Sequence, residues 1–200
     1  MNIGVIPVKN FQVIIVDDFY TQEEYGSMLN ECLFLCDKRK LRPPEETGSA
    51  KSNDGKILKS NNGFFLDEIY SNRNISDILF HNRKIFNRQF TQKLVDIDIV
   101  YRYLSDSNLD TTLLSYYENN DYYKTHKDSS RITAISWFFL QPKFFFGGEL
   151  IVENEWKIDC LANRTVIFPS ILFHEVTQIQ MDKEHLNQKK GRFTLSAFVS

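Results

Sequence analysis

The second half of the chain is built from short runs rich in Val, Ile, Phe, Tyr and Thr that are separated by turn residues. Runs of this kind predict β-strands, and a series of them favours an antiparallel sandwich or barrel. We expect strands at residues 97–103, 111–117, 131–140, 148–152, 165–168 and 193–199. This half of the chain is therefore constrained to fold mainly as β-sheet.

The first half begins with a strand-like run, FQVIIV at residues 11–16, and continues with helical signals. Thr21 and Glu24 fit a capping box, in which each side chain can bond the free amide of the other residue at a helix N-terminus. Apolar side chains then recur at helical spacing up to residue 36. Cys32 and Cys36 lie in this stripe, so we expect them to pack in the core.

A short strand is predicted at residues 64–66, followed by a second helix from a cap at Asn74 or Ser76 to about Leu94. The apolar face of that helix would be formed by Leu79, Phe86 and Phe90. Helices ahead of a β-rich half predict an α+β fold that is mainly β, with the N-terminal helices packed on one sheet.

Residues 37–62 are dominated by polar residues, glycines and a Pro-Pro pair, and offer little to anchor a core. We expect a long mobile loop here, with a hairpin around Asp54-Gly55. Loops of this length inside a compact domain often lie over a functional site as a lid. An incidental surface insertion is the equally weighted alternative.

The chain has 200 residues, which is enough to bury a full core, and we expect a single domain over residues 1–200. Residues 1–96 would supply a strand, helices and the loop, and residues 97–200 the β core. The three cysteines show no disulfide pattern. No leader signature and no apolar run long enough to cross a bilayer is seen, so we expect a cytoplasmic protein without a membrane segment.

The formal net charge of −2 gives no electrostatic case for a nucleic-acid partner. Small basic clusters at residues 38–40 and 189–190 are predicted to be solvated surface. The nucleic-acid class of function is therefore disfavoured.

His126 and Asp128 are separated by one residue, and His174 follows on a later strand-like run. In an extended segment, residues two apart point to the same side, so imidazole and carboxylate could face one ion. Two histidines and one carboxylate form the facial triad of non-haem iron oxygenases, which leaves the other metal positions open. The remaining histidines, His81 and His185, are predicted to be exposed and unrelated to the site.

The segment from Tyr117 to Asp128 resembles the Tyr-x-x-Gly-x-x-Tyr-x-x-His-x-Asp signature of prolyl-4-hydroxylase-like Fe(II)/2-oxoglutarate-dependent dioxygenases. Gly147-Gly148-Glu149-Leu150 is similar to their Gly-Gly-x-Leu turn, and residues 168–176 resemble their second ligand strand. Gly191-Arg192 is similar to their site for the far carboxylate of the cosubstrate. The resemblance is close over residues 113–198.

The resemblance implies a double-stranded β-helix, or jelly roll, that holds Fe(II) through His126, Asp128 and His174 as catalytic and metal-binding residues. It implies 2-oxoglutarate as cosubstrate and O2 as oxidant, with ascorbate in a supporting role. Arg192 would pair with the C5 carboxylate of 2-oxoglutarate, because a guanidinium is permanently charged and meets a carboxylate with two parallel hydrogen bonds. Thr194, on the same strand face, and Tyr117 are further candidate donors to the cosubstrate.

The same resemblance implies that several further residues support the metal ligands or contact the substrate. Tyr123 is expected to pack beside the iron, and Arg131 to support the ligands or to pair at the surface. Asn120 replaces the glycine of the signature, and tolerates the left-handed turn that a glycine would adopt. Phe139 stands where a tyrosine donor is common, and Trp137 begins an aromatic run that would help to set substrate specificity.

The leading function is hydroxylation of an unactivated C–H bond in a prolyl or other residue of a protein or peptide. A carboxylate ligand at Asp128 favours hydroxylation over halogenation. A free amino acid or other small metabolite is the alternative substrate, and a non-catalytic cupin-like metal-binding domain is the alternative class. Nucleic-acid demethylation is disfavoured, because the second arginine of those relatives would fall at Phe198.

Overall fold

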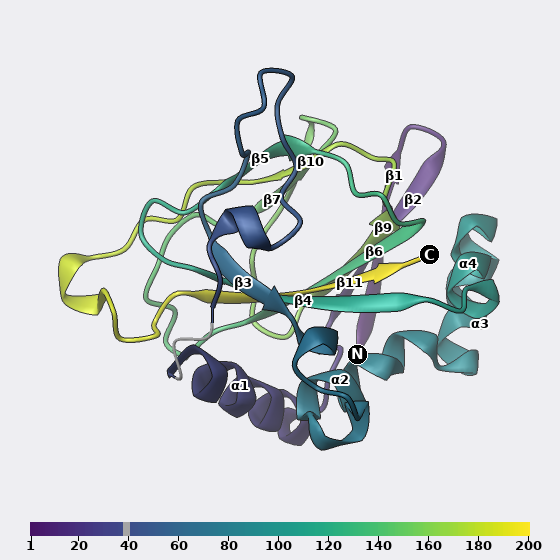
Figure 1. Ribbon diagram of the computed structural model, residues 1–200. Helices are drawn as coiled ribbons and strands as arrows, with labels where there is room; N and C mark the ends of the chain where they lie inside the picture. Colours follow the sequence, from purple (N-terminus) through teal and green to yellow (C-terminus); the bar gives the residue numbers. More distant parts are fainter. Residues whose placement is uncertain (38–40) are drawn as a thin grey trace.

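The computed structural model describes residues 1–37 and 41–200. The basic cluster at residues 38–40 lies outside the described residues. Two antiparallel sheets face each other, and helices cover the outer face of the larger one (Figure 1). No helix of the described chain is long and apolar enough to cross a membrane.

The larger sheet has seven strands in the order β1-β2-β9-β6-β11-β4-β3. Their bounds are β1 Asn2–Val8, β2 Phe11–Asp17, β3 Asn62–Phe65, β4 Asp110–Tyr117, β6 Ile132–Phe138, β9 Thr165–Pro169 and β11 Arg192–Val199. The smaller sheet has four strands in the order β5-β10-β7-β8. Their bounds are β5 Tyr123–His126, β7 Leu150–Val152, β8 Trp156–Ile158 and β10 His174–Val176. Two facing antiparallel sheets confirm the predicted jelly-roll architecture.

Alternation along the central strands separates two cores. On β11, Phe193 and Leu195 belong to the cluster beneath the helices, whereas Arg192 and Thr194 face the smaller sheet. On β6, neighbouring residues divide in the same way, with Phe138 on the helix side and Trp137 between the sheets. Successive side chains on a strand point to opposite faces, so each central strand serves both layers. The polar residues of the inner face mark where a site can form.

The first helix forms as its capping box predicts. In α1 (Gln22–Asp37), the Thr21 amide donates to Glu24 Oε2 at 2.7 Å, and the Glu24 amide donates to Thr21 Oγ1 at 3.2 Å. Cys32 is fully buried beneath the sheet, as expected.

The predicted second helix is wrong in its extent, because it is divided. Ser76 caps α2 (Asp77–Asn82), a 3-10 turn follows at Arg83–Phe86, and Asn87 then caps a separate helix, α3 (Arg88–Ile97). The strand predicted at residues 97–103 is also wrong. That segment ends α3 and continues as a 3-10 turn, Ile99–Arg102, into α4 (Tyr103–Asp106). The remaining predicted strands are present with shifted ends.

Residues 41–62, named here the 41–62 excursion, form an ordered loop that docks on β5. Lys51 and Ile57 pair across the hairpin that was predicted around Asp54-Gly55. The base of this hairpin runs beside β5, where the Lys124 amide donates to the Leu58 carbonyl at 2.8 Å and Lys59 pairs with Tyr123. In Figure 1 the hairpin rises in blue above β5.

Candidate metal and cosubstrate site

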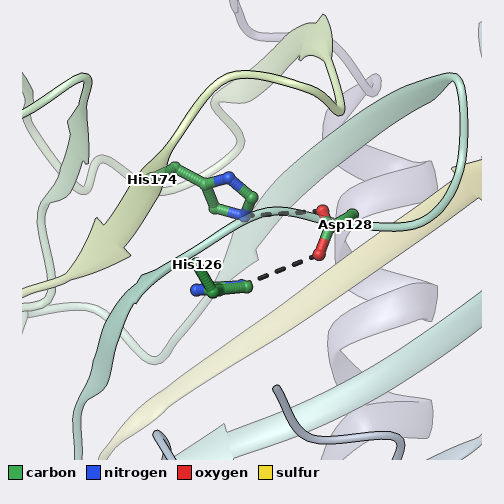
Figure 2. Close-up of side chains that lie close together, drawn as sticks. All are labelled: His126, Asp128 and His174. Atoms are coloured by element: carbon green, nitrogen blue, oxygen red, sulfur yellow. Dashed lines mark ion pairs between the residues drawn. The ribbon is translucent and has the colours of Figure 1, made fainter. Parts of the chain in front are cut away.

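Three potential ligands converge at one end of the smaller sheet. His126 ends β5 and His174 begins β10, and the two residues are direct partners in the antiparallel pairing of these strands. Asp128 follows β5 by two residues and turns back toward both imidazoles (Figure 2). One donor atom from each of the three lies within 4.8 Å of the others. The structure therefore brings together the predicted ligand set, although His174 is far from the other two residues in sequence.

Backbone carbonyls aim the two imidazoles. His126 Nδ1 lies 2.8 Å from the Lys124 carbonyl, and His174 Nδ1 lies 3.0 Å from the Leu172 carbonyl. A carbonyl can only accept, so each Nδ1 carries a proton, and Nε2 is the nitrogen that is left to bind a metal. Both Nε2 atoms face Asp128, at 3.6 Å for His126 and 3.4 Å for His174.

The protonation state of His126 also suits a ligand. Burial and, to a smaller degree, the neighbouring His174 lower the pKa of His126 to about 3. A neutral imidazole is the form that binds a metal. Two imidazoles and one carboxylate with open space beside them fit Fe(II) in the facial-triad arrangement.

A chain of hydroxyl groups holds the carboxylate. Thr133 Oγ1 donates to Asp128 Oδ2 at 2.6 Å, and Ser170 Oγ lies 2.8 Å from Thr133 Oγ1. Each hydroxyl has one proton, so Ser170 donates to Thr133, and Ser130, at 2.8 Å, donates to Ser170. Thr133 and Ser170 are both fully buried, and the chain fixes one oxygen of the carboxylate.

The predicted cosubstrate anchor lies on the inner face of the larger sheet. Arg192 is completely buried, its Nη1 donates to the Gly148 carbonyl, and its guanidinium lies 4.1 Å from the centre of the Tyr117 ring. Its Nε and Nη2, and the hydroxyl of Thr194, have no hydrogen-bond partner among the described residues. Buried polar atoms without partners are costly, so this group of donors fits a carboxylate ligand.

The ligands and the anchor line one pocket between the sheets. Trp137 lines it as well, directly opposite Thr194 in the β6–β11 pairing. Tyr123 is stacked on His126 with ring centres 3.6 Å apart, as expected for a residue beside the metal. Phe139 follows the end of β6, is buried against Phe145 and is not among the residues that line the pocket, whereas Ile135 and Trp137 of β6 do line it.

Three other predicted residues lie away from the ligands. Arg131 is exposed and stacks over Tyr103, which agrees with the surface alternative. His81 and His185 are half-buried rather than exposed, because they pack against Phe80 and Phe144, but neither joins the ligand group. Asn120 has a φ of 71°, as its replacement of a turn glycine predicts.

Sequence reasoning missed three polar residues of the site. Thr133 and Ser170 were not singled out, since a hydroxyl beside a carboxylate has no local sequence signature. Lys59 belongs to the 41–62 excursion, yet it is 5% exposed and lines the same pocket. Burial lowers the pKa of Lys59 to about 8, and Asp128 acts weakly in the opposite direction.

Comparison with known proteins places this geometry in a family. The model of the 2OG-Fe(II) oxygenase superfamily matches residues 112–199, the segment that contains every predicted ligand and the anchor. This match supports the predicted 2-oxoglutarate-dependent dioxygenase over the cupin-like alternative. The family implies Fe(II), 2-oxoglutarate and O2. No curated protein sequence matches the chain.

Solved structures of prolyl hydroxylases share the fold of this chain. A prolyl-4-hydroxylase from Pseudomonas putida is 13% identical with a TM-score of 0.60, and the alignment covers 94% of this chain and 91% of that one. A prolyl hydroxylase from Trichoplax adhaerens, in complex with a hypoxia inducible factor peptide fragment, is 16% identical with a TM-score of 0.61, covering 94% and 82%. A prolyl 4-hydroxylase from Phytophthora capsici is 13% identical with a TM-score of 0.59, covering 94% and 58%. At these identities the likeness confirms the fold.

Proposed function

We propose that this dioxygenase is a hydroxylase of unactivated C–H bonds that binds Fe(II) through His126, Asp128 and His174. The observation that supports the proposal most is the convergence of three ligand atoms within 4.8 Å, in one pocket with a buried guanidinium that has free donors. If Arg192 served only to stabilise the fold through an ion pair, a carboxylate of the protein would accept hydrogen bonds from these donors. We also propose that residues 1–200 act as a single domain.

The side chains divide the tasks of binding and orientation. Arg192 and Thr194 would hold the C5 carboxylate of 2-oxoglutarate, and Tyr117 would border it. When bound, Fe(II) would supply oxygen activation, in which 2-oxoglutarate is oxidised to succinate and CO2 while one oxygen atom enters the substrate. The protein contributes a buried pocket, a fixed ligand geometry and an anchored cosubstrate. Ascorbate would support turnover by keeping the iron reduced.

The proposed substrate is a prolyl or other residue of a protein or peptide. The prolyl hydroxylase of Trichoplax adhaerens, solved with a peptide fragment, shares the fold and supports this choice. A free amino acid or another small metabolite is the second candidate. The pocket suits either one, since both histidine ligands are buried, Asp128 is partly exposed, and residues of the 41–62 excursion line one side.

Succinate formation tests the enzymatic proposal directly. We expect purified protein with Fe(II), 2-oxoglutarate and O2 to release succinate slowly without a prime substrate, and His126→Ala or Asp128→Ala to abolish the release. His185→Ala is the matched control, because His185 packs against Phe144 outside the ligand group. Succinate release by the His126→Ala variant at the wild-type rate would contradict the ligand assignment.

A further inference from the structure

Lys59 places a second cation in the pocket, apart from the cosubstrate anchor. It comes from the 41–62 excursion and pairs through its backbone with Tyr123, the residue stacked on His126. Its Nζ donates to the Thr47 carbonyl at 3.1 Å and lies 5.5 Å from the centre of the Tyr123 ring. The side chain is therefore held on the metal side of the pocket.

The ammonium group lacks a counter-ion of its own. Its side chain is 5% exposed, and no carboxylate in residues 1–37 and 41–200 forms an ion pair with it. The Thr47 carbonyl occupies one of three N–H donors. Asp128 acts on Lys59 only at longer range, and one oxygen of Asp128 is already bound to Thr133. Burying an unpaired charge is costly, which favours a site where a ligand supplies the opposite charge.

Charge balance in the loaded site indicates what that ligand is. Fe(II), Arg192 and Lys59 bring positive charge, while 2-oxoglutarate and Asp128 bring negative charge. Once the metal and cosubstrate are bound, one positive charge remains in excess. Arg192 lies on β11 of the larger sheet, whereas Lys59 lies beside β5 of the smaller one, so the two cations enter the pocket from different sheets.

We propose that Lys59 binds a carboxylate of the substrate, so that the protein hydroxylates a compound with a carboxylate close to the reacting C–H bond. This inference rests on the proposed function and narrows its substrate class. The carboxylate belongs to a free amino acid, to the C-terminus of a peptide or to an acidic side chain, and these sources share one chemistry. A neutral internal peptide segment leaves Lys59 unpaired.

The test compares matched carboxylates and amides. Three pairs of probes represent the three sources: free L-amino acids with their amides, acetylated dipeptides with a free or amidated C-terminus, and amidated peptides containing Glu or Gln. The melting temperature of the protein loaded with Mn(II) and 2-oxoglutarate, kept free of oxygen, is recorded at graded concentrations of each probe. The variants are Lys59→Met, Lys59→Arg and the control Lys51→Met, whose side chain is exposed in the same excursion.

In at least one pair, wild type and Lys51→Met should be stabilised by the carboxylate at concentrations about tenfold or more below those of the amide. Lys59→Met should respond to both members equally, and Lys59→Arg should keep part of the preference. Equal responses of wild type in every pair, including no response, would overturn the inference without relying on any variant. A preserved preference in Lys59→Met would also overturn it.

Two further measurements separate this inference from other outcomes. Weaker binding of 2-oxoglutarate by folded Lys59→Met would assign Lys59 to the cosubstrate and reject the substrate role. Succinate release by the wild-type protein tests the proposed function independently. If succinate forms while wild type does not discriminate any pair, the substrate inference alone fails; if no succinate forms, the proposed function fails.

Discussion

The same local geometry aims both histidines of the site. In each case Nδ1 donates to the carbonyl of the residue two positions earlier, Lys124 for His126 and Leu172 for His174. The two histidines are direct partners on antiparallel strands, β5 and β10. Their ring centres therefore lie side by side, 4.2 Å apart. Backbone pairing therefore sets the ligand positions more firmly than side-chain packing could alone.

The hydroxyl of Thr133 is expected to matter for metal affinity. Thr133→Val keeps the shape of the side chain but removes the donor to Asp128 and breaks the chain to Ser170. We expect the dissociation constant for Mn(II), measured by calorimetric titration, to rise by about 10- to 100-fold. Thr112→Val is the control, because Thr112 is equally buried but its hydroxyl accepts from Asn82 on the helix side. An unchanged Mn(II) affinity in Thr133→Val would show that the hydroxyl does not orient the ligand.

The shape of the Arg192 side chain should matter beyond its charge. Arg192→Lys keeps a cation but loses the planar fork whose Nε and Nη2 are free. We expect the KM for 2-oxoglutarate in succinate formation to rise about tenfold or more, with a smaller change in kcat. Arg164→Lys serves as control, since Arg164 binds Asp17 with two nitrogens outside the pocket. A wild-type KM in Arg192→Lys would place the C5 carboxylate elsewhere.

At the residue scale, the sequence predicts the ligands and anchor because their chemistry depends on rare residue types at recognisable spacing. His126, Asp128, His174 and Arg192 are of this kind. Lys59 could not be predicted in the same way, because it lies in a polar segment with several lysines. Only its burial in the folded chain distinguishes it from them.

At the element scale, the turn at Gly147-Gly148 connects the anchor to the loop after β10. Both glycines have positive φ, 78° and 76°, and the Gly148 carbonyl accepts from Arg192. A Cβ at Gly147 would lie 2.0 Å from the Gln178 carbonyl oxygen. A side chain at this position therefore meets backbone that cannot easily move.

An alanine at Gly147 should lower the free energy of unfolding by more than the strain of a positive φ alone. Gly147→Ala is compared with Gly55→Ala, whose φ of 81° is similar but whose Cβ would meet nothing within 4 Å. We expect Gly55→Ala to lower the free energy of unfolding by about 1 kcal/mol and Gly147→Ala by clearly more, measured by urea denaturation. Equal losses would show that the clash is relieved without cost.

Two elements were predicted wrongly for identifiable reasons. The helix predicted through Leu94 is interrupted because the Asn87 side chain accepts from the amides of Gln89 and Phe90, which begins a new helix. The β-branched run at residues 97–103 is not a strand because Asp98 caps the following turn and Tyr101 is buried, with its hydroxyl donating to the Ile167 carbonyl at 2.9 Å. Tertiary contacts and caps overrode local propensity in both cases.

At the scale of the whole molecule, metal binding should be linked to global stability, because its ligands come from β10 and the β5 segment. A metal that binds the folded protein but not the unfolded chain stabilises it by mass action. At a hundredfold excess of Mn(II) over its dissociation constant, we expect about 2.7 kcal/mol of added stability. Differential scanning calorimetry with and without EDTA measures this change, and Asp128→Ala should show little of it.

The layered architecture follows from the sequence only in part. The short runs rich in Val, Ile, Phe, Tyr and Thr that form β4, β6 and β11 made a β sandwich or barrel predictable. The order of strands was not, because pairing depends on contacts far apart in the chain. The first strand, β1, escaped prediction altogether, since most of its side chains are exposed at the sheet edge and show no core periodicity.

Because the 41–62 excursion docks on β5, changes in length at the hairpin tip and insertions next to Lys59 should have different effects on the site. The Leu58 and Tyr122 carbonyls accept hydrogen bonds at 2.8 and 3.2 Å, which fix the alignment of the excursion with β5. The distance from the Lys59 ammonium to the histidines is therefore independent of the residues at the hairpin tip. The tip around Gly55 can lengthen or shorten freely. A single residue inserted between Leu58 and Lys59 would instead turn the lysine to the opposite side. The length of the hairpin tip can thus change while the charge of Lys59 stays in the pocket.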